Sequence, residues 1–67
     1  MKIEINGEQV EIPSHCKTIT DLLVHFGLET KIVIIEWNKQ ILEKSNHDKT
    51  CISDGDRIEI VHFVGGG

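Results

Sequence analysis

A single helical pattern constrains the fold of this 67-residue chain more than any other feature of its sequence. Four apolar residues follow the i, i+3, i+4, i+7 spacing of one helix face, namely Ile19, Leu22, Leu23 and Phe26. Thr18 is placed to cap a helix over about residues 18–26, with Asp21 as a short-armed partner in a capping box and Gly27 after its end. Because one such helix cannot bury its apolar face alone, it is expected to pack on a sheet.

The first part of the chain predicts a β-hairpin. Asn6-Gly7 is the typical sequence of a type I′ turn, which needs positive φ at both central residues. A two-residue loop places Ile3 opposite Val10 on one face of the hairpin. Pro13 ends the second strand, because proline cannot donate a hydrogen bond to a neighbouring strand.

Further strands are expected after the helix. Residues 32–37 are β-branched and almost continuously apolar, which is typical of a central strand covered on both faces. Residues 38–39 predict a turn, residues 40–42 a short strand, and residues 43–50 a polar loop with at most one helical turn. Asp54-Gly55-Asp56 has the composition of a turn, and residues 57–64 form the final strand.

The order hairpin, helix, strand, short strand, strand predicts an α+β fold. In this arrangement the helix crosses one face of a mixed sheet of four to five strands, and the last strand pairs beside the first. This is the ubiquitin-like β-grasp. We therefore expect one β-grasp domain over residues 1–64, with a projecting glycine tail at residues 65–67.

Size and composition exclude several classes of protein. A hydrophobic fraction of 39% suits one modest core, and no apolar run approaches the roughly 20 residues of a membrane span. The net charge of −4 argues against a nucleic-acid partner, whose phosphates need clustered Lys and Arg. The first residues lack the apolar segment of a signal peptide, so the expected location is the cytoplasm.

The cysteines and histidines predict no metal site and no disulfide framework. Cys16 and Cys51 are far apart in the sequence, without a CxxC motif, and two reduced thiols are the favoured interpretation. Of the four histidines only His15 lies next to a cysteine, and no recognised zinc-ligand spacing appears.

The sequence ends in Gly65-Gly66-Gly67, which places half of the six glycines at the C-terminus. Three extended residues carry the terminal carboxylate about 10 Å beyond the folded body, without side chains that would widen the channel it enters. This carboxylate is an anionic oxygen nucleophile near neutral pH, suited to attack on the α-phosphate of ATP. Gly67 is therefore the candidate reactive residue. A frayed terminus or a flexible linker is the alternative interpretation of the same tail.

The last strand also predicts a partner-binding surface. If Ile58 and Ile60 face the helix, Val61 and Phe63 point to the opposite face, where they form an apolar patch with one side of residues 32–37. Val64 follows in the same segment. Coverage of the sheet by a terminal Phe is the alternative for Phe63.

The chain resembles a known family in these same segments. Residues 54–67, with the sequence DGDRIEIVHFVGGG, look like the ending of the bacterial sulfur-carrier proteins of thiamine biosynthesis, the ThiS family. The Asn6-Gly7 turn, the Asp21-Leu22-Leu23 helix and the strand of residues 33–38 also match. The likeness covers nearly the whole chain, and only residues 43–51 depart from the pattern.

The resemblance implies a protein co-substrate that is not itself an enzyme. An E1-like adenylating enzyme would use ATP and magnesium to convert the Gly67 carboxylate to an acyl-adenylate. Sulfur from a cysteine desulfurase persulfide would then give a C-terminal thiocarboxylate, from which thiazole synthase would take the sulfur. Arg57 and His62 are candidates for contacts with the activating enzyme, although exposure alone explains both equally well. Trp37 is interpreted as a packing residue.

Other functions fit a glycine-ended β-grasp chain. The small subunit of molybdopterin synthase is also such a carrier, but its chains tend to be longer. In a ubiquitin-like protein modifier, a lysine amine instead of sulfur would attack the activated C-terminal carboxylate. A plain binding module would use the apolar patch and leave the tail idle.

Overall fold

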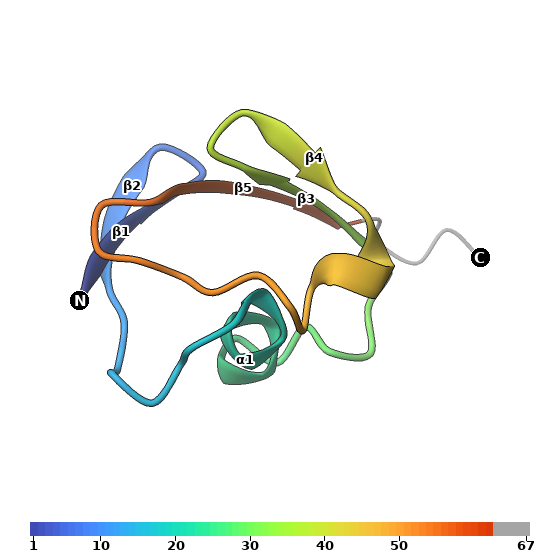
Figure 1. Cartoon of the computed structure of the whole chain (residues 1–67), viewed down its shortest axis with the longest axis horizontal. Helices are drawn as coiled ribbons and strands as arrows, with labels where there is room; N and C mark the ends of the chain where they lie inside the picture. The colour runs from blue at the N-terminus through green and yellow to red at the C-terminus, as the bar shows by residue number, and fades with distance from the viewer. Residues whose placement is uncertain (63–67) are drawn as a thin grey trace.

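The computed structural model describes residues 1–62, and these form a five-stranded mixed sheet with one α-helix on one face (Figure 1). The strands lie in the order β2-β1-β5-β3-β4. β1 and β5 are parallel and the other neighbouring pairs are antiparallel. The elements are β1 (Lys2–Ile5), β2 (Glu8–Glu11), α1 (Ile19–His25), β3 (Val33–Trp37), β4 (Gln40–Leu42), the 3-10 helix η1 (Lys44–Asn46) and β5 (Arg57–His62). This order confirms the predicted β-grasp fold.

The first hairpin has the predicted register. Asn6 and Gly7 have φ values of 49° and 85°, as a type I′ turn requires. Ile3 pairs with Val10, and Ile3 is buried under the helix. β2 ends at Glu11, two residues before Pro13, as expected.

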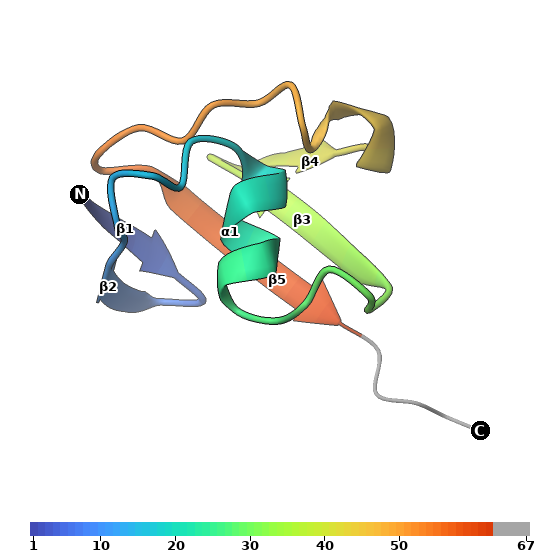
Figure 2. The ribbon, with the colours of Figure 1, turned by 90° about the horizontal axis from the view of Figure 1, so that it is seen from below.

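The helix α1 has a satisfied N-terminus. The Thr18 hydroxyl accepts a hydrogen bond from the Asp21 N–H, and the Asp21 carboxylate accepts one from the Thr18 N–H, which confirms the capping box. The next two backbone N–H groups donate hydrogen bonds to the loop that precedes β5. The Ile19 N–H donates to the Thr50 carbonyl at 3.1 Å, and the Thr20 N–H donates to the His47 carbonyl at 3.2 Å. The orphan donors of the first turn are therefore paired, and the pairing fastens this loop to the helix (Figure 2).

The end of the helix differs from the prediction at Phe26. Gly27 has a φ of 71° and follows the helix as expected. Phe26, however, lies beyond the last helical residue, and 42% of it is exposed. The prediction that it completes the buried stripe is wrong, because its side chain lines an open hollow with Val10 and Leu28 instead of being enclosed in the core.

Strand β3 is also less buried than predicted. Ile35 faces the helix and is fully buried, whereas Ile34 points to the other face and is 44% exposed. Ile32 lies before the strand begins and is exposed. Coverage on both faces was expected from the apolar run and is wrong, because α1 packs on one face only (Figure 1).

The core lies between the helix and the inner face of the sheet. Its buried apolar residues come from the sheet, the helix and the connecting loops, and they are Ile3, Ile12, Cys16, Ile19, Leu22, Leu23, Ile35, Ile52, Ile58 and Ile60. Within residues 1–62, no helix is long and apolar enough to cross a membrane.

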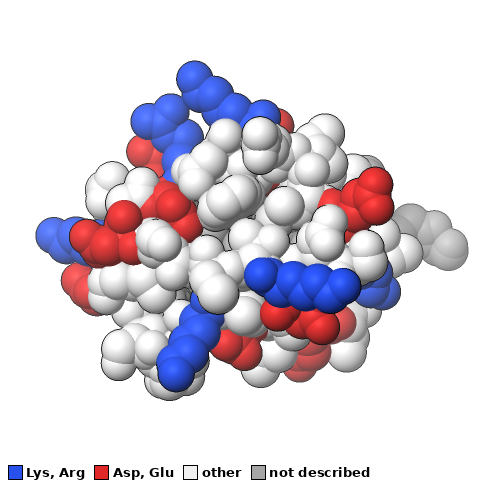
Figure 3. All heavy atoms as spheres, viewed as in Figure 1, with Lys and Arg blue, Asp and Glu red and all other residues white. Residues whose placement is uncertain are grey.

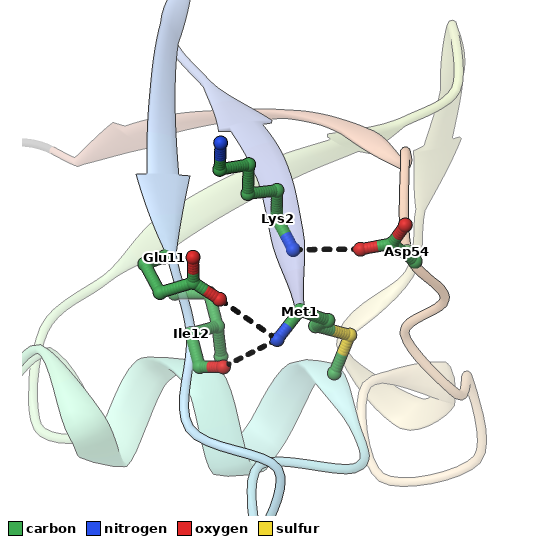
Figure 4. Close-up of polar contacts among 5 residues, drawn as sticks. All are labelled: Met1, Lys2, Glu11, Ile12 and Asp54. Carbon is green, nitrogen blue, oxygen red and sulfur yellow. Dashed lines mark hydrogen bonds and ion pairs between the residues drawn. The ribbon is translucent and has the colours of Figure 1, made fainter.

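Polar contacts at Met1 and Lys2 join the start of β1 to its neighbours (Figure 4). The Met1 amino group donates to the Ile12 carbonyl at 3.0 Å and lies 3.1 Å from the Glu11 carboxylate. The Lys2 N–H donates to the Asp54 carboxylate at 2.7 Å. These contacts link β1 to β2 and to the turn that leads into β5.

Candidate functional site

The C-terminal end of β5 is the candidate functional site, because it leads into the glycine tail. β5 is the central strand, with Ile58 beside Ile5 of β1 and Val61 beside Ile34 of β3. Pairing with β1 at Arg57 and Ile58, and with β3 from Ile58 to His62, fixes the direction of the strand. The predicted site residues Phe63, Val64, Gly65, Gly66 and Gly67 lie outside the described residues, so their roles stay predictions.

An apolar patch covers the outer face of the sheet beside this strand end. Ile34 and Val61 are direct cross-strand neighbours, 44% and 51% exposed respectively. Ile41 of β4 is 71% exposed and lies opposite Glu36, on the same face as Ile34. We call Ile34, Ile41 and Val61 the outer apolar patch. Val61 and one side of β3 are exposed as the sequence predicted, and their role in partner binding stays a prediction. Ile41 was missed, although it alternates with the inward-facing Leu42.

Two carboxylates lie beside the outer apolar patch. Glu36 and Glu59 are direct neighbours on β3 and β5, on the same face, and neither has an ion pair within residues 1–62. Like charges placed directly opposite each other are unfavourable in a sheet. Elsewhere the two signs of charge are interspersed, as the face drawn in Figure 3 shows. The outer face therefore offers apolar contact together with local negative charge.

Arg57 stands at the opposite end of β5 from the tail. Its side chain lies 3.2 Å from the Glu4 carboxylate, in an ion pair between neighbouring strands. This ion pair within the sheet gives Arg57 a structural role. Its predicted contact with the activating enzyme stays a prediction. His62 is exposed and lies at the rim of the groove described next.

A groove of about 530 Å³ opens on the helix side of the same strand end. Asn6 forms part of its wall and binds β5 through its side chain, which donates to the Ile60 carbonyl at 3.1 Å and accepts from the Ile60 N–H at 2.7 Å. The Asn6 side-chain amide thus makes two hydrogen bonds with the backbone of β5, at the point where β1 has ended and no longer pairs with it. The residues that line the groove are Ile5, Asn6, Glu8, Val10, Phe26, Leu28, Ile60 and His62.

The beginning of β5 is held by a buried carboxylate. Asp56 accepts hydrogen bonds from the Ser53 N–H at 2.8 Å, from the Trp37 indole at 3.1 Å and from the Asn38 amide at 3.1 Å. Trp37 packs against the core as predicted. The turn at Asp54-Gly55-Asp56 was predictable from the sequence, but the hydrogen bonds of Asp56 were not, since turn composition does not distinguish a buried Asp from an exposed one.

The chain is similar to known proteins over nearly its whole length. The model of the family described as the ThiS family matches residues 2–67. The sulfur carrier protein ThiS of Bacillus subtilis (strain 168) is 48% identical over 65 residues, which cover 97% of this chain and 98% of that protein. A thiazole synthase of Paramagnetospirillum magneticum (strain ATCC 700264 / AMB-1) is 40% identical over 67 residues, which cover all of this chain and 20% of the longer protein.

A solved structure agrees with the sequence comparisons. The crystal structure of the thiamine biosynthesis protein ThiS from Geobacter metallireducens aligns over 100% of both chains, with a TM-score of 0.83 and 30% identity. The likeness therefore extends to the complete arrangement of helix and strands.

Proposed function

This chain belongs to the ThiS family, and from that premise we propose that it is a sulfur carrier of thiamine biosynthesis. The observation that carries the proposal is the 48% identity to the Bacillus subtilis sulfur carrier over nearly the full length of both chains. The glycine ending and the apolar surfaces at the root of the tail support it. The chain acts in this proposal as a protein co-substrate located in the cytoplasm.

The proposed chemistry takes place at the Gly67 carboxylate. One of its oxygens attacks the α-phosphate of ATP, which forms an acyl-adenylate and releases pyrophosphate. The terminal sulfur of the donor's persulfide then attacks the acyl carbon and AMP leaves, which gives an acyl disulfide. A second cysteine thiol attacks the donor's sulfur, so that the S–S bond breaks, a cysteine disulfide forms and the thiocarboxylate is left on Gly67. The residues before it, Gly65 and Gly66, allow entry into narrow active sites because they have no Cβ.

The folded body supplies the surfaces that hold partners during these steps. The outer apolar patch and the groove flank β5 on its two faces, so an enzyme that takes up the tail meets apolar surface on either side. The facing carboxylates of Glu36 and Glu59 favour a partner with basic groups opposite them.

Three partners are proposed for the reaction cycle. An E1-like adenylating enzyme uses ATP and magnesium to activate the tail, and a cysteine desulfurase supplies the sulfur. Thiazole synthase accepts it, a proposal supported by the likeness to the Paramagnetospirillum thiazole synthase, 20% of which resembles this chain.

The test is the mass of the protein after incubation with ATP, magnesium, the adenylating enzyme and a persulfide donor. We expect replacement of one oxygen by sulfur, located on the C-terminal peptide and confirmed by alkylation of that peptide. Alkylation is needed because oxidation of Met1 adds nearly the same mass. Omission of ATP and deletion of Gly67 are the controls, and both should prevent the change.

Two results would contradict the proposal. An adenylated chain that never gains sulfur, and is instead joined to lysine amines, indicates a protein modifier. No change at Gly67, with enzymes that act normally on the Bacillus subtilis carrier, indicates a binding module whose tail is idle.

A further inference from the structure

Three metal-binding side chains converge at a place unconnected with the tail. His15 and Cys16 lie in the loop between β2 and α1, and His25 is the last residue of α1. One donor atom from each lies within 4.8 Å of the others. No metal site was predicted from the sequence, because His15 and Cys16 are adjacent and no recognised zinc-ligand spacing appears.

The helix geometry explains why His25 reaches the loop. The Cys16 thiol lies against the Asp21 carbonyl, with Sγ 4.0 Å from the oxygen. His25 is four residues after Asp21, so both lie on the same face of α1. Side chains of a helix point toward its N-terminus, which directs the His25 ring back toward Cys16. The loop is held in place by the hydrogen bond from the Cys16 N–H to the Pro13 carbonyl at 3.1 Å.

The two imidazole rings already face each other edge to face. The ring centroids of His15 and His25 are 6.5 Å apart, with an interplanar angle of 72°. Both side chains are exposed, whereas Cys16 is buried beneath them. A buried sulfur with two exposed nitrogen donors beside it leaves one side open for a metal ion to enter.

We propose that His15, Cys16 and His25 form a binding site for Zn²⁺. Two imidazole nitrogens and one thiolate are a donor set that zinc prefers, with bonds of about 2.0–2.3 Å in a tetrahedron. Such bonds place donor atoms roughly 3.3–3.8 Å apart, so closure from the present arrangement needs a movement of about 1 Å by the exposed imidazoles. Binding displaces the thiol proton of Cys16 to solvent, and water takes the fourth position.

The charge of the surroundings favours a cation. A small hollow of about 150 Å³ lies here, lined by His15, Asp21, Val24 and His25. The Asp21 carboxylate accepts hydrogen bonds from the backbone N–H groups of Lys17 at 2.9 Å and Thr18 at 3.1 Å, and it adds negative charge beside the site.

Zinc at this site ties the loop before α1 to the C-terminal end of the helix. Because the metal binds only the folded arrangement of the three ligands, it stabilises the fold in proportion to its occupancy. None of the three residues belongs to β5 or to the outer apolar patch, so metal binding is separable from the proposed carrier chemistry.

The test is a titration of tag-free protein with Zn²⁺ against a chromophoric chelator, in a Cys51→Ser background. That background removes the exposed second thiol, which would bind metal by itself. We expect one Zn²⁺ per chain and a rise in melting temperature with zinc. His15→Asn and His25→Gln should each lower the affinity at least about 10- to 100-fold, since loss of a group that only hydrogen-bonds to a metal ligand already costs that much. The matched control is His62→Asn, an exposed histidine outside the cluster, which should leave the affinity unchanged.

Cobalt supplies a direct readout of the sulfur ligand. Co²⁺ bound at the site should show a thiolate-to-metal charge-transfer band that disappears in Cys16→Ser. If Cys16→Ser fails to fold, the band in the parent protein and its loss in the two exposed histidine variants still decide the question. Zinc affinity unchanged by His15→Asn and His25→Gln, or a cobalt complex without the sulfur band, overturns the proposal.

Discussion

At the scale of single residues, Asp56 shows how one buried carboxylate positions a strand. It joins the turn before β5 to the end of β3 by accepting from Ser53, Trp37 and Asn38. Asp56→Ala would leave these donors without their acceptor. We expect a loss of about 2–4 kcal/mol in the free energy of unfolding, since hydrogen bonds to a charged group contribute about 1.5–3 kcal/mol and are not additive.

Urea denaturation followed by Trp37 fluorescence measures this loss, because the indole is itself one of the donors. Asp56→Asn keeps one carbonyl oxygen and should cost less than Asp56→Ala. Asp48→Ala, at an exposed position, is the matched control and should change stability by less than about 0.5 kcal/mol. Equal effects at positions 48 and 56 would show that the network does not stabilise the fold.

Asp21 makes stability depend on pH. Its folded-state pKa lies below the usual value of 3.8, mainly because it accepts the Lys17 N–H at 2.9 Å and then the Thr18 N–H at 3.1 Å. A depressed pKa means that the carboxylate stabilises the fold above pH 3.8, and that this contribution is lost as the pH falls through the folded-state pKa. Asp21→Asn should therefore be less stable than the parent at neutral pH, with a difference that shrinks in acid.

Urea midpoints from neutral pH to about pH 3 test this dependence. EDTA should be present, because Asp21 lines the hollow beside the proposed zinc ligands. Asp48→Asn serves as the control, with no change in the pH profile expected. A difference between Asp21→Asn and the parent that stays constant at every pH would contradict the assignment.

At the scale of elements, β5 combines a buried inner face with an exposed outer one. Replacing Ile34 and Val61 together by Thr keeps the β-branched shape and removes apolar surface from the outer patch. If the adenylating enzyme covers this patch, we expect about a 10-fold rise in KM, from roughly 1–1.5 kcal/mol of lost apolar burial, with kcat unchanged.

Pyrophosphate release at varied carrier concentration separates KM from kcat. Val24→Thr is the matched control, because Val24 is 54% exposed on α1, away from the sheet's outer face. An unchanged KM in the double variant would show that the patch is not part of the docking surface.

The elements themselves were predictable where local sequence determines them. Asn6-Gly7 indicated the first hairpin, and Thr18 with Asp21 indicated the start of α1, because turn type and capping depend on neighbouring residues. The solvent exposure of individual side chains was not predictable from local sequence. Ile34 is apolar in a run of apolar residues, and only the presence of a single covering helix leaves it exposed.

The candidate site was predictable only where it depends on local sequence patterns. Val61 followed from strand alternation, whereas Asn6 acts on Ile60, 54 residues away, through contacts that no local pattern encodes. The approach of His25 to Cys16 likewise depends on where the loop crosses the helix. Local rules therefore identify elements, and contacts between distant residues require the fold.

At the scale of the whole molecule, stability and reactivity are expected to reside in different parts of the chain. The buried apolar core runs from Ile3 to Ile60, whereas the proposed chemistry is at Gly67. Deletion of Gly66 and Gly67 should leave the melting temperature unchanged and abolish adenylation. Adenylation of the shortened chain would contradict the proposed reactive group, and a large fall in melting temperature would contradict the separation.

Gly66→Ala tests the tail more finely, because it keeps the carboxylate and adds only one methyl group. A Cβ at this position restricts φ and ψ and widens the segment that must enter the adenylating site. The patch and groove lie outside the tail, so docking should be retained while the activation step slows. The dissociation constant, from equilibrium binding, and the single-turnover rate of pyrophosphate release measure the two effects separately. An unchanged rate would mean that the tail does not pass through a close-fitting channel, and equal losses in rate and affinity would mean that the tail itself contributes to docking.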